Sequence, residues 1–413
     1  MAGGFSLFEG DFLNRALARL GAGSDRPYAT ARRIALLVGL TWVVLALLSW
    51  SQGHLLADRP REAFLKDLAA YAQFLGFIPL SLIAEIYIGV RMALACRHLK
   101  QVCDADALSG AMSRAERLAK HKRADGVCLF LGYVFTMLWA CDEVSNGLSS
   151  WHTAVMPAGT VATGPGPVCV ALVCAALGKS VGNGEVFTLA GAYAAFFCLP
   201  LFTYLWLRWV WKVVVWTLFL IRLSRLRLSL IATHLDATGG LGSLSDVQTS
   251  FGLILFGTGV LFSTAIWYKV AMEHTPVSAF TVWVPIIGYI LLAPSVFVGP
   301  LFVFSRTLYR VKTEAQLPYG ALALKIAQNY EKRWLDISAD RADALLSDPQ
   351  TSTLADFKNN YHSVQAMRVV PFDWRSLKGL FLSAAGPFIP AVLDFLELPQ
   401  GVKAFLELWV GHR

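Results

Sequence analysis

One acidic side chain stands out because it falls near the middle of a long apolar segment. Residues 73–96 form an apolar run of membrane-spanning length, and Glu85 is close to its centre. An ionised carboxylate at the centre of a bilayer costs roughly 3 kcal/mol on insertion scales, so something local must compensate for it. Glu85 is therefore a candidate ion- or proton-handling group that faces a pore or cavity. The alternative is a purely structural ion pair.

The candidate counter-charges are Arg208 and Lys212, which interrupt the apolar run of residues 186–221. Either of them could pair with Glu85, and a pair that can break would act as a switch. Arg91 is six positions after Glu85 and so lies on a different face of the same helix. The sequence therefore predicts a pore or ion-binding site made of Glu85, Arg208 and Lys212, and both the functional and the structural interpretation stay open.

Helix-breaking residues gather in the apolar run of residues 281–304, namely Pro285, Pro294, Gly299 and Pro300. Each proline removes a backbone donor and can kink a helix. Membrane helices tolerate such breaks where neighbouring helices or a water-lined cavity satisfy the freed carbonyls. This run could supply a gate or hinge, although an ordinary proline-kinked span would explain the same residues.

The most motif-like loop contains His234, Asp236, Gly239 and Gly240. A histidine and an aspartate two positions apart could ligate a metal, and clustered glycines could let backbone amides approach an anion. No phosphate-loop spacing accompanies them, and the other histidines form no pair placed for haem or a di-metal site. We favour turn chemistry, in which the two glycines end the preceding helix. We predict no metal site, no cofactor and no catalytic residue.

Membrane helices are the elements that must position these residues. Of the 413 residues, 56% are hydrophobic and only 15% are charged, whereas soluble domains carry about 25% charged residues. The deficit comes from several long apolar runs. The formal net charge of +8 sits beside those runs, where positive charge fixes orientation, and does not cluster with aromatic residues as in a nucleic-acid binder. We predict an all-α polytopic membrane protein that binds no nucleic acid.

Six apolar runs predict six transmembrane helices in a domain of residues 34–305. The runs are residues 34–51, 73–96, 126–141, 193–218, 252–271 and 281–304. Basic residues are abundant before the first run, between the second and third, between the fourth and fifth, and after the sixth. This alternation predicts that both termini are cytoplasmic.

Two further regions flank the predicted membrane domain. Residues 1–33 contain an amphipathic helix that we expect on the membrane surface or packed on a cytosolic domain. Residues 306–413 predict a helical cytoplasmic region with a break at residues 317–320. Within it, residues 379–393 are apolar but short and contain two prolines. We interpret them as a broken helix that docks on the membrane or dips partway into it, with a seventh span as the alternative.

Three stretches of the second half of the chain resemble a group of uncharacterised bacterial polytopic inner-membrane proteins. They are His234-x-Asp236-x-x-Gly239-Gly240-Leu-Gly242, Leu317-Pro-Tyr-Gly320, and the segment from Ala355-Asp356 to Met367-Arg368-Val-Val-Pro371-Phe372. The group has a proline after the histidine, where this chain has Leu235. The resemblance implies the bacterial inner membrane and a cytoplasmic tail that belongs to the same unit. It implies no activity.

The sequence favours a channel or transporter for a small ion. Glu85 would be the site carboxylate, Arg208 and Lys212 its counter-charges, and the proline-broken sixth helix the gate. The expected partners are membrane lipid and further copies of the chain, because a single short bundle would have difficulty shielding these three charges. One alternative is a membrane scaffold or signalling protein that acts through its cytoplasmic helices. The other is a membrane-embedded enzyme with a site near His234 and Asp236, which the absence of hydrolase, zinc-protease and nucleotide-binding motifs disfavours.

Overall fold

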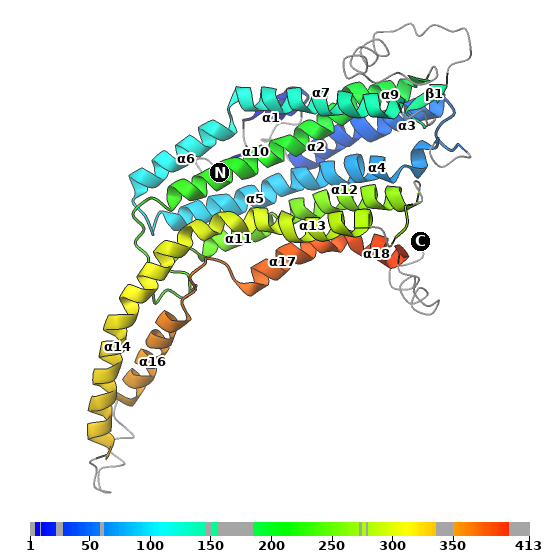
Figure 1. The fold of residues 1–413 in the computed structure, drawn as a ribbon. Coiled ribbons are helices and arrows are strands. Elements are labelled where there is room, and N and C mark those ends of the chain that lie inside the picture. Colours follow the sequence, from blue (N-terminus) through cyan, green and yellow to red (C-terminus); the bar gives the residue numbers. More distant parts are fainter. Residues whose placement is uncertain are drawn as a thin grey trace.

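Apolar segments form long helices that run alongside one another in a bundle (Figure 1). The computed structural model describes residues 5–8, 10–21, 28–57, 62–145, 150–155, 185–271, 275–277, 280–335 and 350–395. Within these residues, seven helical stretches are long and apolar enough to cross a membrane. They are Ala29–Ser51, Leu68–Leu99, Ala105–Cys141, Leu189–Leu223, Gly242–Ala271, Phe280–Asn329 and Trp374–Leu393. The predicted all-α membrane fold is confirmed, with one candidate span more than the six expected.

The first part of the chain contains a short helix followed by two bundle-length runs. Each run combines α-helix with a π-helical stretch, in which the backbone is wider than in an α-helix. The elements are α1 (Phe12–Arg19), α2 (Ala29–Val38), the π-helix η1 (Gly39–Val43), α3 (Val44–Ser51), the 3₁₀-helix η2 (Phe64–Lys66), α4 (Leu68–Ala70), the π-helix η3 (Tyr71–Phe77) and α5 (Ile78–Leu99).

The next part contains two more runs, joined at one end by a short antiparallel ribbon. Its elements are α6 (Ala105–Ala119), α7 (Lys122–Ser145), β1 (Thr153–Val155), β2 (Glu185–Phe187), α9 (Leu189–Tyr193), the π-helix η4 (Ala194–Cys198) and α10 (Leu199–Leu223). In the ribbon, Thr153 pairs with Phe187. The helix that contains the predicted span at residues 126–141 is longer than that span, because α7 begins at Lys122 and includes the charged residues before the apolar run.

The π-helical stretch η4 has a local cause in the sequence. Pro200 lies two positions after it and has no N–H to donate to the carbonyl of Phe196, four positions earlier. The hydroxyl of Tyr133 on α7 donates to that carbonyl instead, at 3.3 Å. A neighbouring helix thus satisfies the freed backbone group, as a helix in lipid requires.

The last part contains three more runs and a helical hairpin that projects from the bundle (Figure 1). Its elements are α11 (Gly242–Ser250), α12 (Gly252–Ala271), α13 (Phe280–Val298), the 3₁₀-helix η5 (Gly299–Phe304), α14 (Ser305–Leu335), α16 (Gln350–Ala366), α17 (Trp374–Ala385), the 3₁₀-helix η7 (Gly386–Phe388) and α18 (Ile389–Phe395). The predicted break at residues 317–320 is wrong, because α14 continues through Pro318. In this exposed hairpin, water can satisfy the one backbone carbonyl that the proline leaves free.

The apolar residues 379–393 belong to a longer run than the sequence suggested. Asp373 caps α17 by accepting the N–H of Ser376 at 2.8 Å, so the helix begins before the apolar residues do. In Figure 1, α17 and α18 lie beside α12 and α13 along the bundle. A Cβ added to Gly259 of α12 would lie 2.9 Å from Pro387 Cγ, which shows how closely this run packs. The segment is therefore part of a seventh run that is long and apolar enough to cross a membrane, which fits the alternative of a seventh span.

The two ends of the bundle differ in their connections. At the hairpin end, where α14 and α16 leave the bundle, the loops after α5 and α10 meet, and Ser229 N–H donates to Val102 O at 2.7 Å. The ribbon end, where β1 and β2 lie, is opposite (Figure 1). Basic side chains at the hairpin end include Arg97, Lys100 and Lys312.

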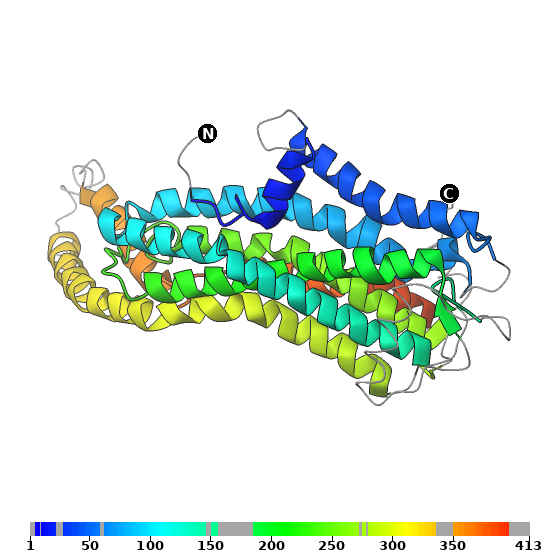
Figure 2. The ribbon, with the colours of Figure 1, turned by 90° about the horizontal axis from the view of Figure 1, so that it is seen from above.

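The N-terminal segment, residues 5–19, lies against the bundle and not on a separate surface. Figure 2 shows it in dark blue beside the long helices. Its buried side chains include Phe5, Leu7, Phe8, Leu13 and Leu17, all of which belong to the main hydrophobic core. The predicted amphipathic helix exists as α1, and its apolar face packs into the hydrophobic core of the bundle.

Candidate functional site

The three charged residues that the sequence singled out meet inside the bundle. Glu85 lies on α5, and Arg208 and Lys212 lie one turn apart on α10. The Arg208 guanidinium donates through Nη1 to Glu85 Oε1. The side chains of Arg208 and Glu85 are 2% and 6% exposed. The intramembrane acid therefore faces a guanidinium within the same chain.

A fourth charged residue, Asp11, completes the site and was missed in the sequence. Its Oδ2 atom accepts Arg208 Nε at 2.7 Å and lies 2.6 Å from Nη2 of the same guanidinium. Lys212 Nζ is 3.4 Å from the same oxygen, and the Asp11 side chain is fully buried. We call Asp11, Glu85, Arg208 and Lys212 the charge cluster. With all four ionised, the cluster has two negative and two positive charges and is neutral.

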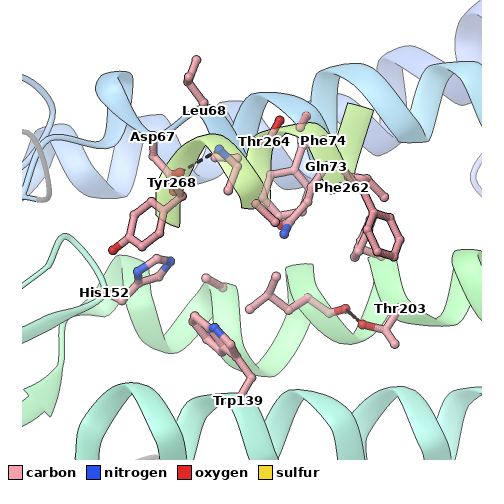
Figure 3. A pocket seen from close by; sticks show the side chains of 18 of the residues that line it. Asp67, Leu68, Gln73, Phe74, Trp139, His152, Thr203, Phe262, Thr264 and Tyr268 are labelled. Carbon is pink, nitrogen blue, oxygen red and sulfur yellow. Dashed lines mark hydrogen bonds between the residues drawn. The ribbon is translucent and has the colours of Figure 1, made fainter. Parts of the chain in front are cut away.

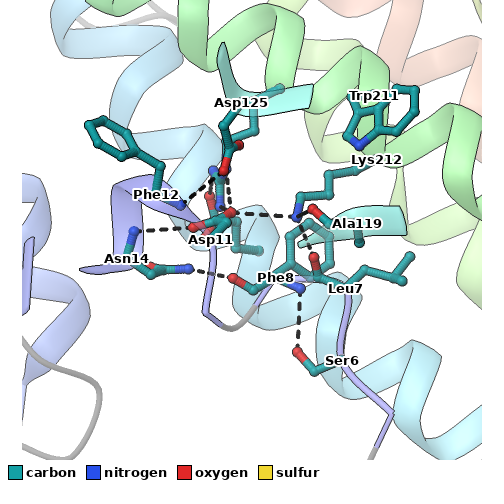
Figure 4. Close-up of polar contacts among 12 residues, drawn as sticks. Ser6, Leu7, Phe8, Asp11, Phe12, Asn14, Ala119, Asp125, Trp211 and Lys212 are labelled. Carbon is teal, nitrogen blue, oxygen red and sulfur yellow. Dashed lines mark hydrogen bonds and ion pairs between the residues drawn. The ribbon is translucent and has the colours of Figure 1, made fainter. Parts of the chain in front are cut away.

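Backbone carbonyls of two separate segments complete the surroundings of Lys212 (Figure 4). Its ammonium donates to the carbonyl of Leu7 and, at 3.2 Å, to the carbonyl of Ala119 at the end of α6. It also lies 5.8 Å from the ring centroid of Phe8. The lysine thus ties the N-terminal segment to α6 and α10.

Asp11 is held in place by the helix that it begins. It is the N-cap of α1, and its carboxylate accepts the N–H of Asn14 at 3.1 Å. The N–H of Phe12, the residue after Asp11, donates to the carboxylate of Asp125 on α7 at 3.1 Å (Figure 4). Burial raises the pKa of Asp11, but Arg208, Lys212 and the Asn14 N–H together outweigh that effect and leave the pKa below its ordinary value. Asp11 is therefore an ionised carboxylate inside the protein.

The charge cluster explains how one chain can keep four charges in an apolar bundle. Buried charges cost several kcal/mol each unless they are paired and hydrogen-bonded. Here each charge has an opposite neighbour or a backbone partner, and the N-terminal segment supplies half of the negative charge. A single chain already shields Glu85, Arg208 and Lys212, so the shielding of these charges does not require an oligomer.

The proline-containing run lies elsewhere and has its own polar contact. The Gln248 side chain donates to Phe297 O at 2.6 Å and accepts Trp216 Nε1 at 3.2 Å. Phe297 O needs this donor because the helix tightens at Gly299 and Pro300 has no N–H. Pro285 and Pro294 lie inside α13, which packs mainly on α12 and α17, while η5 contacts α10.

The structure thus does not bring Pro285, Pro294, Gly299 and Pro300 to the charge cluster. Phe297 of this run is joined through Gln248 to Trp216 of α10. Tyr289, which lies between Pro285 and Pro294, instead donates to Leu255 O of α12. Trp216 is one turn beyond Lys212 on the same helix. The link between the proline break and the cluster is therefore helix α10 itself.

The loop of His234, Asp236, Gly239 and Gly240 is a turn organised by one carboxylate. Asp236 accepts the N–H groups of Thr238 at 2.8 Å, Gly240 at 3.0 Å and Gly242 at 2.8 Å. Burial raises its pKa, but these bonds lower it more, to about 2. Gly239 and Gly240 have φ of 68° and 100°, the left-handed region that glycine adopts readily. Turn chemistry therefore accounts for Asp236, Gly239 and Gly240, and His234 Nδ1 lies 2.8 Å from Asp236 Oδ1.

The same loop corrects one detail of the sequence interpretation. The two glycines do not end the fourth long helix, because α10 ends earlier, at Leu223. They instead shape the turn before α11, and Arg368 fastens it by donating to Asp236 O at 2.9 Å and Ala237 O at 2.7 Å. Among the described residues, no group of three or more histidine, cysteine or acidic side chains is placed to hold a metal ion.

A cavity of about 730 Å³ lies near the ribbon end, and the sequence did not indicate it. Figure 3 shows it between η3 and α12 on one side and α10 and α7 on the other. Its lining residues come from segments far apart in the sequence, so no local pattern marks them. None of the four charge-cluster residues lines it.

The fold and the apolar helices define the class: this is a helical, multi-pass membrane protein. No family model, curated protein or solved structure matches the chain.

Proposed function

We propose that this chain is a membrane transport protein for a small ion, and that the described conformation is its closed state. The observation that carries the proposal is the charge cluster, in which a docked N-terminal segment supplies one of the two acids. Intramembrane ionisable residues mark ion and substrate pathways more often than they serve packing alone. The cluster is enclosed here, so transport requires it to open.

The charge count indicates which kind of ion the open cluster would favour. When the N-terminal segment leaves, it removes Asp11, and Arg208, Lys212 and Glu85 remain with a net charge of +1. A positive site in a low-dielectric interior attracts anions strongly. We therefore propose a small anion, with Asp11 occupying its place in the closed state. Glu85 would then hold Arg208 in position and keep the net charge of the open site at +1.

The proline break supplies a candidate hinge for such opening. Helix η5 packs on α10, which carries both cations of the cluster. Just before η5, Phe297 of α13 is joined to Trp216 of α10 through Gln248. Movement of the broken helix would therefore be transmitted to α10. Because of this indirect connection to the charge cluster, the proposed gate remains the set Pro285, Pro294, Gly299 and Pro300.

We propose the bacterial inner membrane as the location, with the hairpin end in the cytoplasm. The loops rich in arginine and lysine meet at that end, as expected for the cytoplasmic face. Cys141, near the ribbon end, is disulfide-bonded, which fits an oxidising compartment on the other side. If all seven runs cross, α18 ends on the ribbon side, opposite to the cytoplasmic C-terminus expected from six spans. Membrane lipid and further copies of the chain remain proposed partners.

Ion flux into liposomes tests the proposed function directly. Purified protein is reconstituted, and chloride and potassium flux are compared for the wild type, Asp11→Asn and Glu85→Gln. Asp11→Asn weakens the closed state, so chloride flux should rise while potassium flux stays at the background. Asp106→Asn is the matched control, because Asp106 is an exposed acid on α6. Absence of chloride flux for every variant, or an equal rise in potassium flux, would refute the proposal.

A second candidate function, a scaffold or signalling protein, is supported by the α14–α16 hairpin. This hairpin projects beyond the bundle (Figure 1) and carries exposed apolar side chains, including Leu317 and Leu324, which are 77% and 60% exposed. Exposed apolar residues on a projecting helix are typical of a docking surface. Leu317→Ser with Leu324→Ser should then abolish function without changing ion flux, whereas unchanged function would exclude this candidate. The enzyme alternative gains no support, because backbone amides occupy the Asp236 carboxylate.

A further inference from the structure

The cavity near the ribbon end has the size and the walls of a binding site for an apolar chain. Its volume of about 730 Å³ lies within the roughly 300–1,000 Å³ typical of ligand pockets. Side chains from both sides contribute large apolar surfaces, including Phe74, Phe202, Trp206, Leu261 and Phe262. Figure 3 shows Phe74 and Phe262 on one side of it.

The cavity walls remain partly accessible from outside the bundle. Trp206 and Phe262 are 36% and 44% exposed although both line the cavity. Their helices, α10 and α12, belong to two of the runs long and apolar enough to cross a membrane. An apolar chain could therefore enter from the hydrocarbon region of the bilayer.

Polar and charged groups gather at the end of the cavity beside β1. This end is lined by Lys66, Asp67, His152 and Lys269. Asp67 is engaged by Trp151 Nε1 at 3.0 Å and by the N–H of Ala69 at 2.8 Å. Lys66 and Lys269 are both exposed, and Lys66 Nζ also donates to Ala57 O at 3.3 Å.

The charge balance of this end is positive. Burial lowers the pKa of His152 to about 4, although Asp67 counteracts the effect, so the imidazole is neutral near pH 7. The lining of this end therefore includes two lysines and one aspartate, and the aspartate carboxylate already accepts two hydrogen bonds. An anionic group complements this end better than a cationic one.

We propose that the cavity binds an amphiphile with an acyl chain and an anionic head group. The chain lies between α10 and α12, and the head group contacts Lys66 and Lys269 at the ribbon end. This inference goes beyond the proposed ion transport and does not depend on it, because the cavity and the charge cluster share no residue. A cavity of this size takes one acyl chain, so a free fatty acid or one chain of an anionic phospholipid would occupy it.

Tryptophan quenching by a brominated acyl chain tests the proposal on the intact protein. Trp139, Trp206 and Trp267 line the cavity, so a bound brominated chain quenches their fluorescence. Full-length protein in a neutral detergent is titrated with dibromostearate. We expect saturable quenching in the wild type and its loss in Ala265→Phe, which fills the cavity from α12.

A matched control keeps this result specific to the cavity. Leu292→Phe also places a ring on a membrane helix, but Leu292 is 69% exposed on α13 and does not line the cavity. This variant should quench like the wild type. Quenching that does not saturate, or that is the same in Ala265→Phe, would overturn the proposal and show only partition into the detergent.

The head group is tested separately. Replacing both lysines, Lys66→Gln with Lys269→Gln, should weaken dibromostearate binding about threefold to tenfold, as expected for two partly exposed ion pairs. Binding of the brominated alcohol of the same length should not change. Lys100→Gln, an exposed lysine at the hairpin end, serves as the control for total charge. Equal binding of acid and alcohol by the wild type would overturn the anionic assignment.

The source of the acyl chain is distinguished by two further probes. Unbrominated phosphatidylglycerol that relieves the quenching by dibromostearate identifies a membrane phospholipid as an occupant. Failure of phosphatidylglycerol to compete, with dibromostearate still saturable, restricts the site to free fatty acids. Competition by neutral phosphatidylcholine to the same degree as phosphatidylglycerol would contradict the selectivity for an anionic head group.

Discussion

Substitution of Asp11 by asparagine should undock the N-terminal segment from the bundle. Asp11 is the acid that this segment contributes to the charge cluster, and Arg208 and Lys212 both contact its Oδ2 atom. Asparagine has nearly the same shape and can still accept the N–H of Asn14 as an N-cap. The substitution therefore removes the charge and leaves the cap, so its effect measures the electrostatic part of docking.

The expected size of the effect follows from the geometry. The 2.7 Å separation of Asp11 Oδ2 and Arg208 Nε corresponds to a gross attraction of about 6 kcal/mol at an effective dielectric constant of 20. Much of it is offset by the cost of burying both charges, and breaking a buried ion pair costs about 3–5 kcal/mol in total. Because Arg208 keeps Glu85 as a partner, we expect the lower value, about 3 kcal/mol.

Limited proteolysis measures this free energy locally. Arg15 and Arg19 lie on exposed positions of α1, and trypsin cleaves them only when the helix opens. A loss of about 3 kcal/mol raises the open population, and therefore the cleavage rate, about 100-fold. Cleavage of wild-type protein under identical detergent conditions gives the reference rate.

A second substitution separates charge balance from packing. Lys212→Met added to Asp11→Asn leaves Arg208 and Glu85, one charge of each sign, and should recover about 1–2 kcal/mol of the loss. The recovery is partial because Leu7 O and Ala119 O lose their donor. If trypsin cleaves the double variant faster than the Asp11→Asn variant, the loss of Lys212 has only added to the destabilisation. That result would refute the reasoning that a neutral cluster is the more stable one.

Three further predictions concern the parts that support the charge cluster. Gln248→Leu should lower the free energy of unfolding by about 2–4 kcal/mol, because Phe297 O and a buried indole N–H lose their partners. Gly259→Ala should cost about 1–3 kcal/mol, since the new Cβ would lie 2.9 Å from Pro387. Asp236 has a lowered pKa, about 2 against an ordinary 3.8, so its contribution is complete above about pH 4 and is lost as the pH falls toward 2. After allowance for its partial exposure, that contribution is about 1–2 kcal/mol.

Denaturation followed by tryptophan fluorescence checks all three, with matched controls. Gln101→Leu and Gly110→Ala change exposed or open positions of the same residue types and should stay within about 0.5 kcal/mol of the wild type. An unchanged midpoint for Gln248→Leu would show that the proline break needs no side-chain donor. For the pH series, Asp236→Asn should remove the loss between pH 4 and pH 2, and its persistence in that variant would assign it to another group.

The apolar runs predicted most of the fold because lipid imposes a length on each crossing. The predicted span 252–271 coincides with α12, and 34–51 lies within the run that begins at Ala29. The pairing of Glu85 with Arg208 could also be predicted, since a buried charge needs a partner and few were available. Charged or proline-containing ends were harder, because Asp125 and Pro387 resemble boundaries in the sequence but lie inside helical runs.

The sequence could not identify Asp11 as the fourth member of the cluster. It is 197 positions from Arg208, and which helices meet depends on packing that no local pattern records. The one available signal was an aspartate in the N-terminal amphipathic segment, and that residue also suits an ordinary N-cap. The cavity was missed for the same reason, because its lining comes from several distant segments.

The π-helical stretches η3 and η4 each separate two parts of a long helix. The side-chain directions of one part can therefore change without those of the other part. Successive residues of an α-helix differ by about 100° around the axis, and a π-helical stretch absorbs one extra residue. Deleting one residue within η3 would rotate Lys66 and Asp67 away from the cavity mouth while Glu85 kept its orientation. A single insertion or deletion within η3 can thus change the lining of the cavity while the charge cluster keeps its geometry.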